Sequence, residues 1–182
     1  MKHLFFTSLF VLFTFFSFSQ KKTTTSATIN FDATTSIDKL PKAENKTVVA
    51  AIHTKKGTVQ FEATIKNFTF SNPRIQEHFN SKGWMSSDEF PTAVFNGTIT
   101  NISAINFRKN GTYTAQVEGD LTIHGKTQKI KTVATFVISE DEINSSCDFG
   151  IQLADYGIDS PAVGAGKVAR DPKISVKATF DN

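Results

Sequence analysis

The chain has 182 residues, a single cysteine and a formal net charge of +3 at pH 7. One cysteine excludes an intramolecular disulfide, so a hydrophobic core has to hold the fold together. No basic stretch is interleaved with aromatic residues, and we therefore expect no nucleic-acid partner.

The N-terminal segment has the features of a secretory signal peptide. A short basic start precedes residues 4–18, which are almost wholly apolar, and Ser17 and Ser19 place small residues at the two positions that a signal peptidase reads. We expect a signal peptide at residues 1–19 and a periplasmic or secreted protein with no stable membrane insertion after cleavage. An uncleaved anchor is the alternative, because the apolar run approaches the shortest length that spans a membrane. Residues 20–182 are long enough to form one domain with its own core.

Apolar and polar residues alternate along most of the remaining chain, which is typical of strands with one buried and one exposed face. The cleanest run covers residues 113–123, with Val117 and Leu121 on the apolar face and Glu118 and Asp120 on the polar face. The pattern predicts eight strands: one from about residue 28, then 47–53, 59–65, 93–99, 113–123, 133–137, 147–153 and 174–180. Short links favour antiparallel pairing, and eight antiparallel strands close into a barrel that holds side chains or one ligand. The predicted fold class is therefore all-β, an eight-stranded antiparallel barrel.

Residues that tolerate positive φ mark the expected hairpin turns. Lys56-Gly57, Asn110-Gly111 and His124-Gly125 all fit tight turns between strands. His124 is expected to be exposed at its turn. Residues 23–26, Thr-Thr-Thr-Ser, are expected to form a flexible start.

The alternation is interrupted between the third and fourth strands. Apolar positions change phase after Ile65, and a bulge near Lys66-Asn67 would produce that change. Asn72 followed by Pro73 is a capping residue with proline at the first helical position. The sequence therefore predicts one short helix over residues 72–79.

Motifs of catalysis and cofactor binding are missing from the sequence. It contains no G-x-S-x-G motif, phosphate loop or dinucleotide-binding glycine pattern. His53, His78 and His124 do not lie at metal-ligand spacing from another ligand, so we expect no enzyme activity and no metal site. Cys147 is in phase with Phe149 and is expected to be a small buried hydrophobic residue.

Large apolar side chains crowd the region from the third to the fourth strand, and they allow two interpretations. In the first they fill the barrel core, with the short helix plugging it. In the second they form the wall of a tunnel for a long apolar molecule. The residues concerned are Phe61, Phe68, Phe70, Phe79, Trp84, Met85, Phe90 and Phe95.

Three motifs in this region and beyond it resemble the YceI-like family of secreted lipid-binding barrels, in its shorter bacterial form. The first is E-H-F-N at residues 77–80, followed by Trp84-Met85 and by F-P-x-A-x-F-x-G at residues 90–97. The second is GDLTIHGKT at residues 119–127, which is similar to the family's G-x-L-T-I-x-G-x-T. The third is DYGI at residues 155–158, similar to D-[FY]-G-I.

The resemblance implies a lipocalin-like barrel that is exported and holds a polyisoprenoid or a similar long-chain amphiphile. The expected partner is a long-chain apolar small molecule, and no cofactor is expected apart from a bound isoprenoid lipid or quinone. The alternative is a non-binding structural or stress-related envelope barrel with a filled core.

The aromatic cluster and the resemblance together give the candidate ligand-binding residues. These are Phe61, Phe68, Phe70, His78, Trp84, Met85, Phe90, Phe95 and Tyr156. Tyr156, His78 and Arg74 are the candidates to meet a polar head group at the mouth of the barrel. Gly83-Trp84 stands where the short forms usually have a smaller polar residue and a tyrosine, so we expect Trp84 to narrow the cavity.

Overall fold

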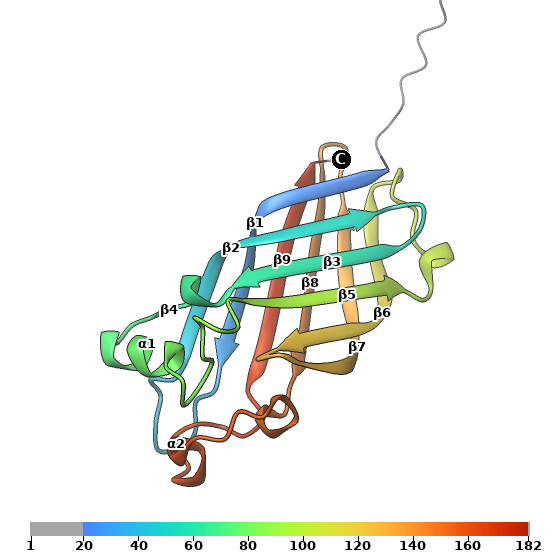
Figure 1. Ribbon diagram of the computed structural model, residues 1–182. Helices are drawn as coiled ribbons and strands as arrows, with labels where there is room; N and C mark the ends of the chain where they lie inside the picture. Colours follow the sequence, from blue (N-terminus) through green and yellow to red (C-terminus); the bar gives the residue numbers. More distant parts are fainter. Residues whose placement is uncertain (1–19, 182) are drawn as a thin grey trace, which may run out of the picture.

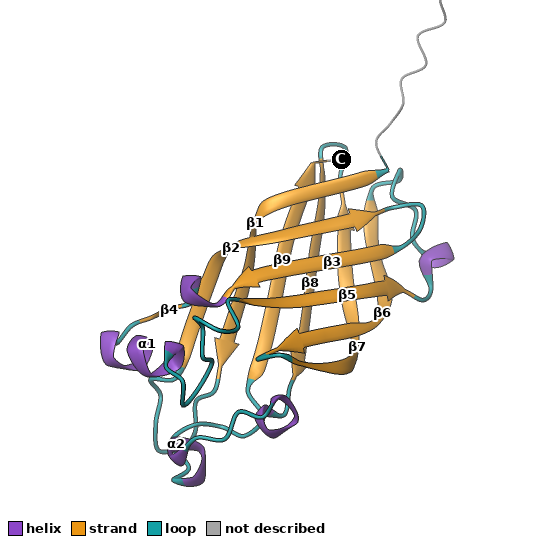
Figure 2. Cartoon of the chain, in the orientation of Figure 1, coloured by secondary structure: helices purple, strands orange, loops and turns teal. Residues whose placement is uncertain are grey.

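The computed structural model describes residues 20–181, and the predicted signal peptide at residues 1–19 lies outside them. The described chain contains nine strands (Figures 1 and 2). They are β1 (Lys21–Asp32), β2 (Lys42–His53), β3 (Thr58–Thr64), β4 (Thr69–Phe70), β5 (Thr92–Ile99), β6 (Gly111–Ile123), β7 (Lys126–Ile138), β8 (Glu142–Gly150) and β9 (Lys173–Asp181).

The strands form one closed antiparallel sheet. Neighbours run in the order β1-β9-β8-β7-β6-β5-β3-β2, and β2 pairs back onto β1. The two-residue strand β4 pairs with the start of β2 and takes no part in the closure. The predicted eight-stranded barrel is confirmed, with β4 as an extra strand beside it.

The register of β6 shows how alternation separates the inside of the barrel from the outside. Val117 and Leu121 are only 7% and 8% exposed. On the opposite face, Glu118 and Asp120 pair across to Lys131 and Lys129 of β7, each at 2.9 Å. The predicted register of this strand is confirmed, since successive side chains of a strand point to opposite faces.

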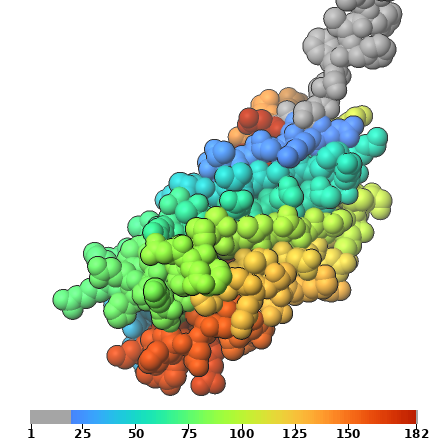
Figure 3. All heavy atoms as spheres, in the orientation of Figure 1, coloured from blue at the N-terminus to red at the C-terminus, as the bar shows by residue number. Residues whose placement is uncertain are grey.

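Most of the irregular segments gather at one end of the barrel, whereas residues 100–110, with the 3-10 turn η2 (Ile102–Ala104), lie at the other (Figure 2). The helices α1 (Pro73–Asn80) and α2 (Pro161–Gly164) lie at the first end, together with the 3-10 turn η3 (Leu153–Tyr156). In the space-filling view the green segment that carries α1 and the orange segment after β8 cover the same end (Figure 3). We call this the loop end. At the opposite end Phe107 packs edge-on against Phe136, with ring centroids 5.7 Å apart.

Local chemistry accounts for the position of α1. The side chain of Asn72 accepts a hydrogen bond from the backbone N–H of Arg74 at 2.9 Å, and proline occupies the first helical position. The predicted helix is confirmed, shifted by one residue. Gln76 then ties the helix to β4, because its amide donates to the carbonyl of Phe68 at 2.6 Å and accepts from the backbone N–H of Phe70 at 3.0 Å.

Three local predictions are wrong. The change of phase after β3 comes from the 3-10 turn η1 (Ile65–Asn67), not from a bulge. Asn110-Gly111 does not form a tight hairpin, because β5 and β6 are joined by residues 100–110, which include the 3-10 turn η2 (Ile102–Ala104). Residues 23–26 belong to β1, in which Thr23 and Thr24 pair with β2, so they are not a flexible start. None of the helices within residues 20–181 is long and apolar enough to cross a membrane.

Candidate functional site

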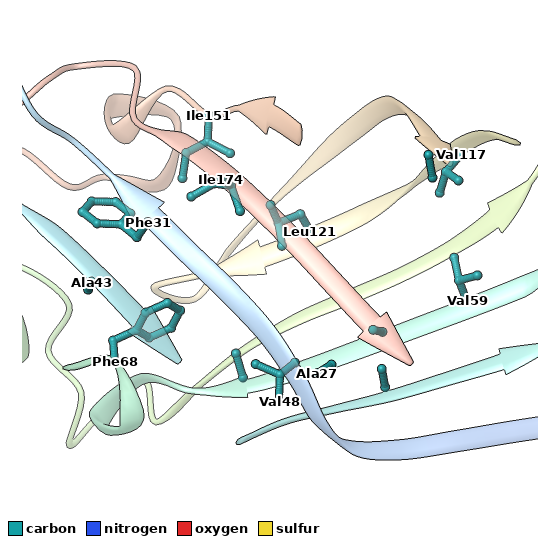
Figure 4. Close-up of a cluster of buried hydrophobic side chains, with 14 of the residues drawn as sticks. Ala27, Phe31, Ala43, Val48, Val59, Phe68, Val117, Leu121, Ile151 and Ile174 are labelled. Carbon is teal, nitrogen blue, oxygen red and sulfur yellow. The ribbon is translucent and has the colours of Figure 1, made fainter. Parts of the chain in front are cut away.

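An apolar cavity of about 150 Å³ lies inside the barrel. Its lining carries no charged side chain, and its only polar members are Thr132, Ser145, Ser146 and the thiol of Cys147. Strands on all sides contribute to it, as the inward side chains of Val59, Val117 and Leu121 illustrate (Figure 4). The alternation of the strands produces this lining, since every second residue of a barrel strand faces the interior.

A cluster of aromatic rings closes the cavity toward the loop end. Phe79 of α1 is its centre, with ring centroids 4.9 Å from Phe70, 5.9 Å from Phe68, 6.0 Å from Phe31 and 6.1 Å from Trp84. We call these five residues the aromatic wall. The capped helix holds the wall in place, because Phe79 is the buried residue of α1.

Five of the nine candidate ligand-binding residues line the cavity. They are Phe61, Phe68, Trp84, Met85 and Phe95. The side chains of Trp84 and Phe95 are only partly buried, and both border the cavity. Trp84 lies beside the cavity, and the expectation that it narrows the cavity stays a prediction.

The other four candidates lie away from the lining. Phe70 is buried behind Phe79 and supports the aromatic wall from outside the cavity. Phe90 packs edge-on against His124 at 4.7 Å, beside the β6–β7 turn. His78 is exposed on α1, as is Arg74. Tyr156 is only 1% exposed, so it does not lie at a solvent-facing mouth.

The buried Tyr156 contacts His124 of the β6–β7 turn at the loop end. His124 Nδ1 lies 3.1 Å from the backbone carbonyl oxygen of Tyr156. The His124 side chain is half-buried, and the expectation that it is exposed is wrong. The phenolic oxygen of Tyr156 has no hydrogen-bond partner among the described residues. Burial raises the pKa of this phenol to about 12, and Asp155 acts in the same direction.

The sequence reasoning missed the side of the cavity formed by β7, β8 and β9. Ile130, Cys147, Phe149 and Val176 line this side. The alternation of apolar and polar residues in these strands is the sequence signal for this side. The cluster of aromatic residues marks only the region of residues 61–95. Burial raises the pKa of the Cys147 thiol to about 11, with Asp148 as a smaller cause in the same direction. The prediction that this cysteine behaves as a small hydrophobic residue agrees with its place in the lining.

Charged groups lie on the outside of the barrel and do not form a catalytic constellation in the described chain. A hydrogen bond from Lys131 lowers the pKa of Glu118, and a hydrogen bond from Lys66 lowers that of Asp88. Within residues 20–181 no group of three or more His, Cys, Asp or Glu side chains is arranged to hold a metal ion.

The YceI-like domain model matches residues 10–180 of this chain. No curated protein matches it. Among solved structures, a polyisoprenoid binding domain from Saccharophagus degradans, implicated in plant cell wall breakdown, superposes with a TM-score of 0.74 at 12% identity, covering 89% of this chain and 98% of that one.

Two further solved structures share the fold. Burkholderia cenocepacia BcnA has a TM-score of 0.70 at 16% identity, covering 84% of this chain and 95% of that one. A YCEI protein from Campylobacter jejuni has a TM-score of 0.54 at 11% identity, covering 100% of this chain and 99% of that one. Identities this low carry the likeness of fold alone.

Proposed function

The chain belongs to the YceI-like family, and we propose that it is an exported binding protein that holds the apolar tail of a polyisoprenoid or a similar long-chain amphiphile inside the barrel. The observation that carries the proposal is the uncharged lining of the interior cavity. The solved domain of similar fold whose name records polyisoprenoid binding supports the choice of ligand class. Export rests on the signal-peptide pattern at residues 1–19.

The size of the cavity limits what the barrel holds without rearrangement. A cavity of about 150 Å³ is the size that accommodates one benzene molecule in an engineered protein core. One isoprene unit has five carbons, and burying them contributes on the order of 4 kcal/mol at about 0.8 kcal/mol per carbon. Association alone costs about 4 kcal/mol or more. One unit is therefore insufficient, and a ligand of three units, at on the order of 12 kcal/mol gross, is the shortest that supports micromolar binding.

A three-unit tail requires the barrel to widen, and the wall between β7 and β8 is one of the sections held by a short ladder. The ladder between these strands pairs Ala134–Ile138 with residues 143–147 and goes no further along β7. Beyond it, the Thr132 hydroxyl donates to the carbonyl of Asp148 at 3.2 Å. Strands that separate there break few backbone hydrogen bonds, as they would at the equally short β1–β9 and β2–β3 ladders, whereas the thirteen-pair ladder between β6 and β7 resists opening.

Extraction of protein purified from its native envelope tests the proposal directly. Mass spectrometry of an organic extract should detect a long-chain isoprenoid or quinone. Ligand-free protein should melt at a higher temperature when farnesol is added, with a shift that grows with concentration, because a ligand of the folded state stabilises it. Phe95→Glu should abolish the shift, since it places a charge in the lining. Gln60→Glu puts the same charge on the outer face of the neighbouring strand β3 and should leave the shift intact.

The filled-core barrel is the competing account, and the modest cavity volume is the observation in its favour. It predicts no extractable lipid and no change of melting temperature with farnesol or with added quinones. That combined result would refute the binding proposal.

A further inference from the structure

Two glycines face each other across neighbouring strands beside the ring of Phe95. Gly97 of β5 and Gly119 of β6 are direct partners in the ladder. Phe95 precedes Gly97 by two residues, so both are on the face of β5 that points into the barrel. The ring lines the cavity.

The Phe95 ring occupies the space that side chains at these two glycines would fill. A Cβ atom on Gly97 would lie 2.5 Å from Cε1 and Cζ of the ring, and one on Gly119 would lie 2.8 Å from Cζ. Neither glycine has a positive φ, so backbone conformation does not demand glycine at these positions. Glycine fits these positions because it has no side chain. The two glycines leave a shallow depression in the barrel wall, in which the Phe95 ring lies and which we call the ring seat.

We propose that Gly97 and Gly119 determine how much of the interior is open to a ligand, by seating the Phe95 ring against the wall. This inference rests on the proposed function and adds the residues that control access within the same site. A phenylalanine ring is as large as benzene, and a cavity of about 150 Å³ holds about one benzene. A ring displaced from its seat therefore fills the space in which an isoprenoid tail would begin to bind.

The two glycines differ in what a substitution would disturb, and this difference selects the test. At Gly119 an added Cβ would lie 2.4 Å from the carbonyl oxygen of Asn96 and 2.5 Å from the Cα of Gly97, so Gly119→Ala forces β5 and β6 apart. At Gly97 the closest backbone atom is the carbonyl oxygen of Glu118 at 3.0 Å, and the severe contact is with the far end of the Phe95 side chain. Gly97→Ala therefore displaces the ring while the ladder adjusts by a few tenths of an ångström.

Binding of farnesol, a fifteen-carbon isoprenoid alcohol, measures the consequence. Trp84 is the only tryptophan of the chain and lines the cavity, so its emission reports occupancy. We expect Gly97→Ala to weaken farnesol binding at least tenfold while the variant still melts cooperatively. The double variant Gly97→Ala/Phe95→Ala has no ring to displace, and its affinity should return to within about threefold of that of Phe95→Ala alone. Unchanged affinity in Gly97→Ala, or no recovery in the double variant, overturns the proposal.

A crystal structure of ligand-free Gly97→Ala tests the ring seat without any ligand. The expected result is a Phe95 ring that has moved off the wall into the cavity, and a ring that stays against residue 97 overturns the inference. Failure of the wild-type protein to bind farnesol would instead contradict the proposed function, and the ring position would still decide whether the seat exists.

Discussion

Removal of the Phe79 side chain should cost more stability than any other single truncation on α1. Phe79 is 6% exposed and contacts all four other rings of the aromatic wall, at centroid distances of 4.9–6.1 Å. Truncating a buried phenylalanine to alanine costs about 3–5 kcal/mol. One side of the Phe79 ring faces the cavity and has fewer contacts to lose, so we place Phe79→Ala near the middle of that range, at about 4 kcal/mol.

Urea denaturation followed by circular dichroism measures this cost. A domain of this size has an m-value of about 2 kcal/mol per molar urea, so a loss of about 4 kcal/mol lowers the midpoint by about 2 M. His78→Ala is the matched control, because His78 is the preceding residue of the same helix and is exposed. Histidine and phenylalanine have similar helix propensities, so the gain from alanine is the same in both variants. His78→Ala should move the midpoint by less than about 0.3 M.

Equal midpoints for the two variants would refute the reasoning. Such a result would mean that α1 is not anchored through Phe79 and that the aromatic wall does not close the cavity in the way the ring distances indicate. A large shift in both variants would instead show that the helix is held through contacts of His78.

Three further predictions concern burial and ionisation. Val117→Asp should lower the free energy of unfolding by several kcal/mol, since it buries an unpaired charge in the lining. Glu118→Ala, on the outer face of the same strand, should leave the melting temperature nearly unchanged. If thermal melts gave the reverse order, the inward and outward faces of β6 would be assigned one residue out of phase. Tyr156→Phe should raise stability by about 1 kcal/mol at neutral pH, because it removes a buried hydroxyl that has no partner within residues 20–181. The raised pKa of about 12 means that the folded state keeps the phenol neutral while the unfolded state ionises near 10, so the free energy of unfolding of the wild-type protein falls as pH rises from 10 to 12. The variant lacks this phenol, so its advantage over the wild type should grow over the same range; urea melts at pH 8 and 11 that show the same difference between the two proteins would contradict this. The Cys147 thiol should react with a disulfide reagent at pH 8 at least tenfold more slowly than an unperturbed cysteine. Its pKa rises from 9.0 to about 11, which lowers the thiolate fraction about a hundredfold, and the greater nucleophilicity of the more basic thiolate offsets only part of this loss. A rate equal to that of free cysteine would show that the thiol is not buried in the cavity wall.

Features that depend on residues close together in the sequence were predictable from the sequence alone. The alternation of residues 113–123 determined which face of β6 is buried, since side chains of a strand alternate whatever the strand packs against. Asn72 and Pro73 determined where α1 begins, because a cap and a first-turn proline act within one turn. The count of eight alternating segments with short links determined the antiparallel barrel. The motifs at residues 77–97, 119–127 and 155–158 pointed to the family that the domain match then identified.

Features that depend on closure of the barrel were decided only by the tertiary structure. Closure brings β7, β8 and β9 opposite the aromatic segment, and so one side of the cavity lining comes from strands that carry few aromatic residues. The fold of residues 151–172 buries Tyr156 beside the β6–β7 turn, although a tyrosine in a loop motif was expected at the mouth. Phe70 and Phe68 are two residues apart in the sequence, yet only Phe68 reaches the cavity, because η1 and β4 turn Phe70 behind Phe79. Composition and spacing cannot separate residues that line a cavity from residues that support its wall, because both are equally apolar; only their contacts across the barrel distinguish them.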